Sequence, residues 1–435
     1  MSTAIAPNQS RMRIKPQLSC PHCWHEFPTH QILFISESPD LNTDPKLEGY
    51  QQLRFIPSRF DLSGNALDAH NTVCHKLACP KCHLQIPRPL LSTSSFFVSI
   101  AGAPSSGKSY FFTSMVWQLR KTMPRDFLMS FTDADTMMNK RIREHEAEQF
   151  MGGEDPNQPV KIAKTEEVGD IYNTSLIDGR ATTLAQPFSF TVTPLASYPF
   201  PKNVDRVTQT VCMYDNAGEH FYPGADHIQT PVTRHLAASD AIMFLFDPTQ
   251  DLRFRTACKE PVDDPQMSGG TDVRRSKVDQ STILTEMISR IKTHSRMAGN
   301  ERIKIPLIIV LTKLDAWKQL TKFTDDYSPW NPTPNVPTHF YNVGKVEKRS
   351  QELRTLLNKL IPELVGTAEA SAEKVTYIAV SATGCAPELG EVPQGGGERP
   401  LLCRPANIKP IWIEVPFFQA QLMAGKYCVP IFKRK

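Results

Sequence analysis

The chain of 435 residues has no long apolar run and no marked excess of charge of either sign. Crossing a bilayer takes about 20 consecutive apolar residues, whereas the most apolar stretches, such as residues 306–311, have only the length of a strand. The formal net charge is +4, which by itself does not indicate nucleic-acid binding. We therefore expect no membrane span, and we do not expect nucleic acid to be the main partner.

The chain also lacks the signs of secretion. Its first 20 residues contain no apolar core of the kind that a signal peptide needs. Five of its ten cysteines lie within the first 82 residues, mostly as Cys-x-x-Cys pairs. In a chain without a secretion signal such pairs indicate a metal site rather than disulfides, so the expected compartment is the cytoplasm.

Two matched Cys-Pro-x-Cys knuckles stand in the N-terminal part of the chain. Two knuckles can close a tetrahedral site of four thiolates, which is typical of structural Zn²⁺, and a small ribbon of this kind folds because the metal binds. The predicted ligands are Cys20, Cys23, Cys79 and Cys82. The stretch between the knuckles is longer than in common ribbons, and nearby side chains remain as alternative ligands, namely Cys74, His25, His75 and His83.

Residues 102–109 read Gly-Ala-Pro-Ser-Ser-Gly-Lys-Ser, which matches the phosphate-binding pattern G-x-x-x-x-G-K-[ST]. The apolar residues 96–101 predict a buried strand before the pattern, and residues 110–119 predict a helix after it. Because this strand–loop–helix setting is the one that the motif requires, the sequence predicts a nucleoside triphosphate site.

The residue types of this loop fit the chemistry of a triphosphate. Gly102 and Gly107 let backbone amides turn inward around an anion, and the following helix adds the partial charge of its N-terminus. Lys108 can reach the β- and γ-phosphates, and the Ser109 hydroxyl can ligate Mg²⁺. The other predicted nucleotide contacts in this loop are Ser105, Ser106 and Tyr110.

Further strands are predicted from apolar runs, and helices from apolar residues at helical spacing. The predicted strands are 187–193, 207–214, 241–246, 305–311 and 375–380, and the predicted helices are 137–150, 281–296 and 345–361. Strands that alternate with helices indicate a doubly wound α/β fold with a mostly parallel sheet and ligands at the carboxyl ends of the strands.

The same patterns suggest how the chain is divided. We expect a metal-binding domain at 1–92 and a nucleotide-binding domain at 93–435. Insertions are expected near 127–178, 251–277 and 385–405. Three stretches read as loops, namely 152–178, 251–277 and 385–405, and a charged helix is expected at 137–150.

Two of the predicted strands end in motifs that suit Mg²⁺ and a purine base. Residues 215–218 read Asp-Asn-Ala-Gly, in which Asp215 can hold Mg²⁺ through a water and the Gly218 amide can sense the γ-phosphate. Residues 312–315 read Thr-Lys-Leu-Asp. The Asp315 carboxylate can accept from both N1–H and the amino group of guanine, a donor pair that adenine lacks.

A third strand ends in Ser381-Ala382-Thr383, where a backbone amide could meet guanine O6. Each short motif is weak alone, but the motifs stand in one order, each at the end of a predicted strand. Together they predict GTP rather than ATP.

On these motifs, residues 93–435 resemble the Ras-like, translation-factor-related (TRAFAC) class of P-loop GTPases. The resemblance implies a three-layer sandwich with a mostly parallel sheet, in which 102–109 cradles phosphate, 215–218 switches with Mg²⁺, and 312–315 reads guanine backed by 381–382. The implied base contacts are Thr312, Lys313, Asp315, Ser381 and Ala382. The class usually has Asn where this chain has Thr312, a departure that affects a supporting hydrogen bond and not the carboxylate contact.

The two knuckles, together with residues 54–60 and 78–83 and a GTPase rich in insertions, also resemble a narrower bacterial group. These are the zinc-ribbon "double-GTPase" proteins of GTPase-associated gene systems, which are proposed to act in conflict or phage defence. The resemblance covers most of the chain and implies a role in such a system.

Switch I of the resembled class supplies a threonine for Mg²⁺. Thr182 and Thr183 precede the strand at 187–193, and Thr183 is the predicted ligand. Arg180 stands three residues before Thr183, a spacing similar to that of the catalytic arginine in heterotrimeric G-protein α subunits. A solvated loop arginine is the alternative, with the catalytic charge then coming from a partner or from the pair 274–275.

Glu219 follows Gly218 where Ras-like enzymes carry glutamine, and His220 is the second candidate for orienting water. A negative charge near the γ-phosphate is unhelpful, so slow intrinsic hydrolysis is predicted. We thus expect a GTP-binding and GTP-hydrolysing switch, using GTP, Mg²⁺ and Zn²⁺, that a protein partner reads. The alternatives are a nucleotide-locked scaffold and a P-loop ATPase with a nucleic-acid-binding ribbon.

Overall fold

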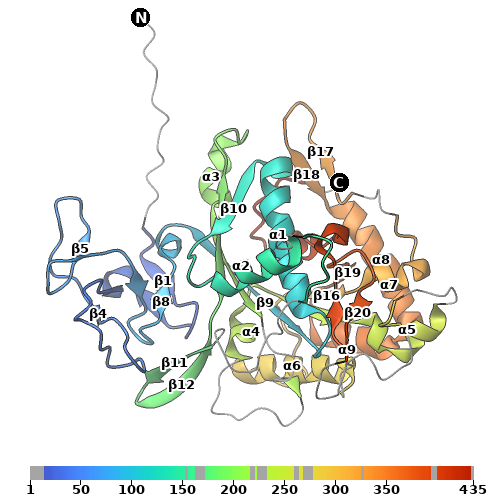
Figure 1. Ribbon diagram of the computed structural model, residues 1–435, viewed down its shortest axis with the longest axis horizontal. Helices are drawn as coiled ribbons and strands as arrows, with labels where there is room; N and C mark the ends of the chain where they lie inside the picture. Colours follow the sequence, from blue (N-terminus) through green and yellow to red (C-terminus); the bar gives the residue numbers. More distant parts are fainter. Residues whose placement is uncertain are drawn as a thin grey trace, which may run out of the picture.

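A seven-stranded, mostly parallel sheet forms the centre of the computed structural model (Figure 1). The structure describes residues 14–151, 155–161, 172–215, 221–222, 233–258, 264–267, 278–324, 328–392 and 399–432. Across the sheet the strands are β10 (Met129–Asp133), β13 (Phe188–Pro194), β14 (Gln209–Asp215), β9 (Ser94–Gly102), β15 (Ala241–Phe246), β16 (Leu307–Leu311) and β19 (Val375–Ala379). β10, β13 and β14 pair antiparallel, and all pairs from β14 to β19 are parallel.

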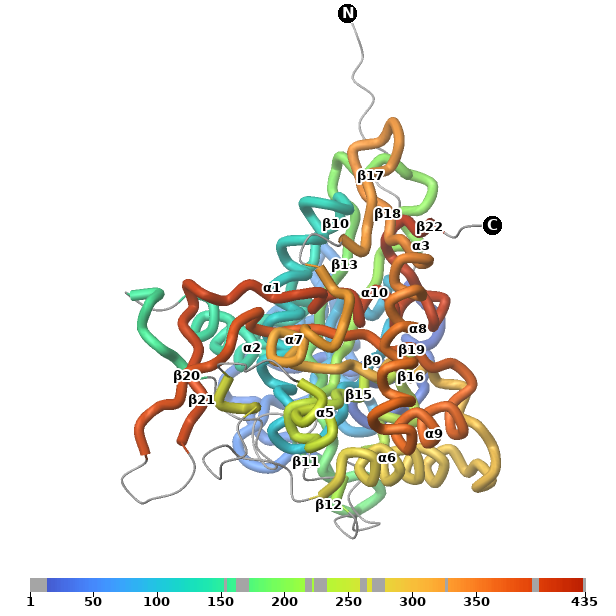
Figure 2. Tube along the Cα trace, turned by 90° about the vertical axis from the view of Figure 1, so that its right-hand side faces the viewer, coloured from blue at the N-terminus to red at the C-terminus, as the bar shows by residue number. Residues whose placement is uncertain are grey.

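The sheet buries both of its faces under helices. Alternate residues of β9, β15 and β16 point to opposite sides, and those three strands are apolar and almost wholly buried, as expected of parallel strands covered on both faces. One face packs on α1 (Lys108–Phe127) and α10 (Val415–Met423). The other packs on α4 (Arg234–Ala238), α6 (Gln280–His294) and α9 (Pro362–Ser371). Figure 2 shows α6 and α9 from the side.

One further helix packs along the edge strand β19, and the domain also contains several smaller elements. Helix α8 (Val343–Leu360) packs along β19 and begins at Asn342, whose side chain accepts from the Lys345 amide as an N-cap. The smaller elements are α2 (Lys140–Glu146), α3 (Val204–Val207), α5 (Leu252–Ala257), α7 (Leu314–Trp317), β17 (Trp330–Pro332), β18 (His339–Asn342), β20 (Glu388–Leu389), β21 (Leu401–Leu402) and β22 (Ile431–Phe432).

The N-terminal part forms a separate small lobe of short strands, drawn in blue in Figure 1. Its strands are β1 (Gln17–Ser19), β2 (Glu26–Pro28), β3 (Leu33–Ile35), β4 (Arg54–Phe55), β5 (Ala66–Leu67), β6 (Val73–Cys74), β7 (Leu77–Ala78) and β8 (Gln85–Ile86). We call residues 14–92 the ribbon. Its apolar core gathers around the four knuckle cysteines, and Leu184 from outside the ribbon completes that core.

The predicted α/β class and mostly parallel sheet are confirmed. The sheet strands predicted after residue 187 agree with β13, β14, β15, β16 and β19 to within two residues at either end. The helix expected at 137–150 is present as α2 followed by a π-helical turn, Ala147–Met151.

The three predicted loop regions were wrong in part. The first contains β11 (Tyr172–Ile177), which forms a hairpin with β12 (Arg180–Ala185) around two left-handed residues, Asp178 and Gly179. The second contains α5, which Asp251 caps by accepting from the Arg253 amide. The third contains the β20–β21 hairpin. In each case local capping or strand pairing, rather than an apolar pattern, stabilises the element.

Among the described residues, no helix is both long and apolar enough to cross a membrane.

Candidate functional site

The four knuckle cysteines meet in one buried cluster. Their Sγ atoms all lie within 4.8 Å of one another. Cys20 Sγ is 3.7 Å from Cys82 Sγ, and Cys23 Sγ is 3.7 Å from Cys79 Sγ, so each close pair joins the two knuckles. The cluster is a possible metal-binding site, and a Cys₄ set of this size suits one tetrahedral ion.

The two knuckles have the same local geometry. In the first, the His22 amide donates to Cys20 Sγ at 3.4 Å, and in the second the Lys81 amide donates to Cys79 Sγ at 3.3 Å. Each knuckle is followed by a residue in the left-handed region, Trp24 at φ 60° and His83 at φ 59°. Amides that point at sulfur stabilise thiolates, which are the form that binds metal.

Burial and competing contacts identify the ligand set. All four cysteines are buried, and burial raises the pKa of the Cys20 thiol well above its ordinary value. A cation is therefore needed before the four sulfurs can ionise together. Two of the four alternative ligands are engaged elsewhere, since His83 Nδ1 lies 2.9 Å from Asp44 and Cys74 Sγ lies 3.7 Å from Asp68. His25 and His75 are not part of the cluster of four sulfurs.

The phosphate-loop sequence forms the turn between β9 and α1. The backbone at Gly102 passes so close to β15 that an added Cβ would lie 2.6 Å from the Leu245 carbonyl oxygen, so a side chain cannot be accommodated there. Gly107 has φ 88°, in the left-handed region that favours glycine, and α1 begins at the next residue. Ser109 and Tyr110 lie in the first turn of α1.

Lys108 is folded over the loop rather than extended into solvent. Its Nζ donates to the carbonyl oxygens of Gly102 at 3.0 Å and Ala103 at 2.8 Å, and the side chain is buried. The Ser106 hydroxyl is also buried and has no hydrogen-bond partner among the described residues. The loop thus concentrates a cation and a spare donor at the N-terminus of a 20-residue helix.

The Thr-Lys-Leu-Asp motif contacts the phosphate loop directly. Thr312 Oγ1 donates to the Ser106 carbonyl at 3.1 Å, and Lys313 Nζ donates to the Ser105 carbonyl at 3.4 Å. The hydroxyl of Thr312 therefore makes a supporting hydrogen bond that the sequence had left in doubt.

Asp247 was not recognised from the sequence, although it also contributes to this arrangement. It follows β15, and its Oδ2 lies 2.5 Å from Lys313 Nζ. The neighbouring Gln250 donates to the Pro104 carbonyl at 3.2 Å and to Asp247 at 3.1 Å. The only sequence signal was an acidic residue directly after a buried strand.

Asp315 is a buried carboxyl group in the first turn of α7. Burial raises its pKa to about 6, a shift that a hydrogen bond from Ser381 partly opposes. Its Oδ1 atom has no hydrogen-bond partner among the described residues. The next residue of the Ser381 loop is fixed as well, because the Ala382 carbonyl accepts from Ser114 of α1 at 2.8 Å.

Asp215 is the last residue of β14 and pairs with Ile100 of β9. The ends of β14, β9, β15, β16 and β19 therefore lie along one edge of the sheet, and they bring Asp215, the phosphate loop and the two base motifs to that edge. The other predicted switch and catalytic residues, Gly218, Glu219 and His220, lie outside the described residues, as do Arg274 and Arg275.

Arg180, Thr182 and Thr183 lie on the β11–β12 hairpin, which runs beside the ribbon in Figure 1. Arg180 is exposed at the start of β12, and among the described residues no hydrogen bond or ion pair joins it or Thr183 to the phosphate loop. In this conformation the hairpin is held by the ribbon, and the catalytic role of Arg180 and the Mg²⁺ role of Thr183 stay predictions.

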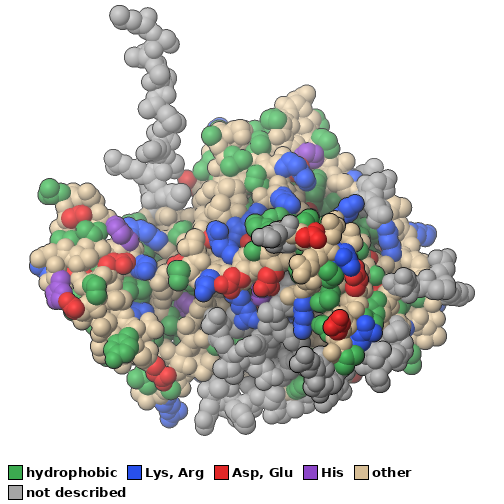
Figure 3. All heavy atoms as spheres, in the orientation of Figure 1, with side chains coloured by type: hydrophobic (Ala, Val, Ile, Leu, Met, Phe, Trp, Pro, Cys, Tyr) green, Lys and Arg blue, Asp and Glu red, His purple; other side chains and the backbone are tan. Residues whose placement is uncertain are grey.

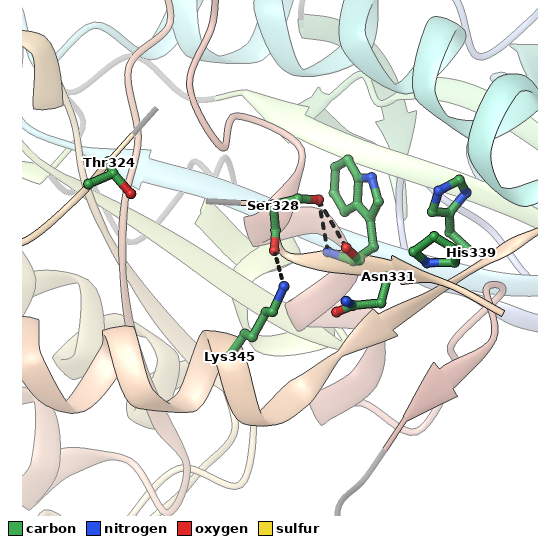
Figure 4. A pocket seen from close by; sticks show the side chains of 7 residues that line it. Thr324, Ser328, Asn331, His339 and Lys345 are labelled. Carbon is green, nitrogen blue, oxygen red and sulfur yellow. Dashed lines mark hydrogen bonds between the residues drawn. The ribbon is translucent and has the colours of Figure 1, made fainter. Parts of the chain in front are cut away.

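A cavity of about 430 Å³ lies away from all of these motifs (Figure 4). It is lined by residues of the β17–β18 hairpin, among them Asn331 and His339, and by Lys345 of α8, whose Nζ donates to the Ser328 carbonyl at 3.1 Å. None of the predicted site residues borders it.

Comparison with known proteins gives one distant likeness. No family model matches the chain. The chain is 24% identical over 245 residues to a proposed ESX-1 scaffolding and assembly protein, SaeC, of Mycolicibacterium smegmatis. The match covers 56% of this chain and 52% of that protein, so the chain spans about half the length of the curated relative that it matches.

Proposed function

We propose that this protein binds GTP with Mg²⁺, hydrolyses it slowly, and uses the resulting change in its switch segments to signal to a protein partner. The ribbon holds one structural Zn²⁺ in this proposal. Cys-x-x-Cys pairs that bind metal suit a reducing compartment, and we assign the activity to the cytoplasm.

One observation carries the proposal: the predicted phosphate and base motifs are bonded to each other at one edge of the sheet. Thr312 and Lys313 both donate to carbonyls of the phosphate loop, and Ser381 bonds Asp315. Segments that are more than 200 residues apart in sequence thus form one surface. Sequence motifs that match by chance would not be expected to form hydrogen bonds with one another.

The sheet topology supports the same edge as a ligand site. From β9 the chain first builds the strands on one side, β10, β13 and β14, and then those on the other, β15, β16 and β19. In open α/β sheets, ligands bind outside the carboxyl ends of the strands where the winding reverses. The phosphate loop follows β9 at that point.

Each side chain has a definite task in this site. The amides of 102–109 and Lys108 would hold the β- and γ-phosphates, and Ser106 supplies a further donor. Ser109 and Asp215 would hold Mg²⁺, which neutralises charge that develops between the β- and γ-oxygens. The free Oδ1 of Asp315 would accept from the guanine base.

Base choice tests the proposal most directly. In Asp315→Asn the amide can donate to the O2 atom of xanthine, so the variant should weaken GTP and strengthen xanthosine triphosphate, each by about tenfold or more. Equilibrium binding of both nucleotides, with ATP as competitor, measures this. Asp205→Asn is the control, because it makes the same change at an exposed position on α3. An unchanged GTP preference in Asp315→Asn would show that Asp315 does not recognise guanine.

The hydrolysis residues need a separate measurement. Arg180→Ala should slow single-turnover phosphate release by at least about tenfold with little change in affinity if its guanidinium acts in the transition state. Equal rates for Arg180→Ala and the parent would assign the catalytic charge to a partner or to another arginine. The same assay applied to Glu219→Ala and His220→Ala identifies the residue that orients water.

A second candidate function is a scaffold that binds nucleotide without hydrolysing it. The name of the Mycolicibacterium relative describes scaffolding and assembly, and Glu219 replaces the usual glutamine. Single-turnover phosphate release separates the two, because a locked scaffold retains its triphosphate.

The distribution of charge on the surface favours a protein partner over a nucleic-acid partner. Over the face shown in Figure 3, Lys and Arg side chains are interspersed with Asp and Glu side chains and form no continuous basic stripe. Binding to DNA or RNA that weakens steeply with salt would favour the nucleic-acid alternative instead.

A further inference from the structure

The two metal knuckles each bond to a different segment of the large sheet domain. In the first knuckle, the Pro21 carbonyl accepts from the Tyr214 hydroxyl at 2.6 Å. In the second knuckle, the Cys82 carbonyl accepts from the Ser175 hydroxyl at 2.7 Å. Both hydroxyls are buried, so each depends on its knuckle for a hydrogen bond.

Apolar packing strengthens the first connection. Trp24 directly follows the first knuckle, and its ring lies 4.9 Å from Phe97 of β9 and 5.6 Å from Tyr214 of β14. The Tyr214 ring is in turn stacked on His235 at 4.7 Å. The first knuckle is therefore seated on the two central strands that lead to the phosphate loop and to Asp215.

The second connection holds the β11–β12 hairpin. The Leu176 amide donates to the Lys46 carbonyl at 2.8 Å, Leu184 is buried in the ribbon core, and Asp178 lies 3.4 Å from Lys81. The ribbon thus contacts the hairpin at its turn, along β11 and at the end of β12.

These contacts fall next to the residues predicted to hold Mg²⁺. Tyr214 immediately precedes Asp215 on β14. On the hairpin, Ser175 is adjacent to Thr174, which pairs with Thr183 across the strands. The base and phosphate motifs are instead bonded within the sheet domain, through Thr312, Lys313 and Ser114.

We propose that Tyr214 and Ser175 are positioning residues, through which the metal-loaded ribbon fixes β14 and the β11–β12 hairpin, the two segments that carry the predicted Mg²⁺ ligands Asp215 and Thr183. The inference rests on the proposed function and extends it. When the Cys₄ site is filled, the knuckle carbonyls hold β14 and the hairpin in place. When the metal is lost, the knuckles are no longer held in position and their carbonyls cease to anchor Tyr214 and Ser175. The Mg²⁺-dependent part of nucleotide binding then weakens, while base recognition persists. Because linkage is reciprocal, bound Mg²⁺–GTP must also strengthen equilibrium binding of the ribbon metal.

The test uses the full chain with its metal and compares Tyr214→Phe, Ser175→Ala and the double variant with the parent. Tyr377→Phe is the matched control, because its buried hydroxyl bonds Glu369 at 3.0 Å, away from the ribbon. Ser130→Ala is the second control, since Ser130 bonds the Thr193 carbonyl on β13 at 3.1 Å.

Four quantities are measured: zinc per chain, the zinc affinity in equilibrium competition with a chelator, the Mg²⁺ concentration for half-maximal binding of a fluorescent GTP analogue, and the affinity for the GDP analogue without Mg²⁺. We expect about one zinc in every protein. The Mg²⁺ midpoint should rise by roughly fivefold or more in each test variant, with Mg²⁺-free affinity unchanged. Mg²⁺–GTP should strengthen zinc binding in the parent and controls but not in the double variant.

Three results overturn the inference, and they can be distinguished from one another. If the parent binds nucleotide but the Mg²⁺ midpoints of the variants equal that of the parent, the positioning role fails and the proposed function stands. If the parent binds no guanine nucleotide at all, both fail together. A parallel loss of Mg²⁺-free affinity in the variants would assign Tyr214 and Ser175 a general structural role and would also overturn it.

Discussion

The ribbon and the nucleotide edge of the sheet assemble their sites in different ways. In the ribbon, each half of the site is complete within four residues, and the fold only has to bring two copies of one turn together. At the sheet edge, no loop is sufficient by itself, and the contacts between Thr312, Lys313 and the phosphate loop depend on the order of five parallel strands. Damage to the ribbon should therefore be all-or-none, whereas damage to the sheet edge should be graded.

The largest effect is expected from Cys79→Ser. Removing one thiolate from a closed Cys₄ site abolishes tight binding, and structural zinc contributes about 10–16 kcal/mol in small metal-folded units. The variant should contain no zinc and should be cleaved within 14–92 by limited proteolysis. Cys74→Ser is the control, because Cys74 is equally buried but lies outside the cluster. Zinc retained by Cys79→Ser would contradict the Cys₄ assignment.

Lys108→Ala should give the next largest effect, confined to the other region. It removes the buried ammonium of the phosphate loop, and charged hydrogen bonds are worth about 1.5–3 kcal/mol each, so GTP affinity should fall roughly 100-fold. Zinc content should not change. Lys121→Ala on the same helix, where Nζ lies over the Trp117 ring, is the control. Unchanged affinity would contradict the phosphate-loop assignment.

The pH dependence of GTP binding tests Asp315. Burial raises the pKa of this carboxyl to about 6, and guanine requires the ionised form, so GTP affinity should fall by up to about tenfold per pH unit below 6. The sign for stability is opposite. Because the carboxyl has a higher pKa in the folded state than in the unfolded state, its protonated form stabilises the folded protein. This contribution to the free energy of unfolding is fully present below pH ~4 and is lost as pH rises through about 6. Asp315→Asn should show neither dependence.

The smallest effect is expected from Thr312→Val, which keeps the shape of the side chain and removes its hydroxyl. The lost bond to the Ser106 carbonyl is worth about 1 kcal/mol, or roughly fivefold in GTP affinity. Thr312→Ser keeps the hydroxyl and should bind like the parent. If the serine variant is as weak as the valine variant, the hydroxyl does not support the loop.

The sequence was most informative where residue type determines the chemistry. The cluster of Cys20, Cys23, Cys79 and Cys82 could be predicted because two matched Cys-Pro-x-Cys knuckles can close one tetrahedral set of four sulfurs. Buried strands such as β15 and β16 could be predicted because continuous apolar runs of five or six residues are typical of parallel strands that are buried on both faces.

Other features could not be inferred from the residues, or were missed despite a signal. The Asp178-Gly179 turn between β11 and β12 is a common hairpin signal, yet its flanking strands are too polar to suggest pairing. Asp247 pairs with Lys313, which lies far along the chain, and no local pattern links the two. The acceptors of Tyr214 and Ser175 are backbone carbonyls, which every residue possesses, so no sequence pattern marks these contacts.

Leu184 has a consequence for how the protein is made. The ribbon is synthesised first, yet this leucine of its core belongs to β12, which leaves the ribosome much later. In the nascent ribbon the four cysteines can already come together, but part of its apolar core stays exposed until the β11–β12 hairpin has been synthesised and packs against it. During that interval, which lasts several seconds at about 5–20 residues per second, early metal capture would protect the nascent chain against aggregation.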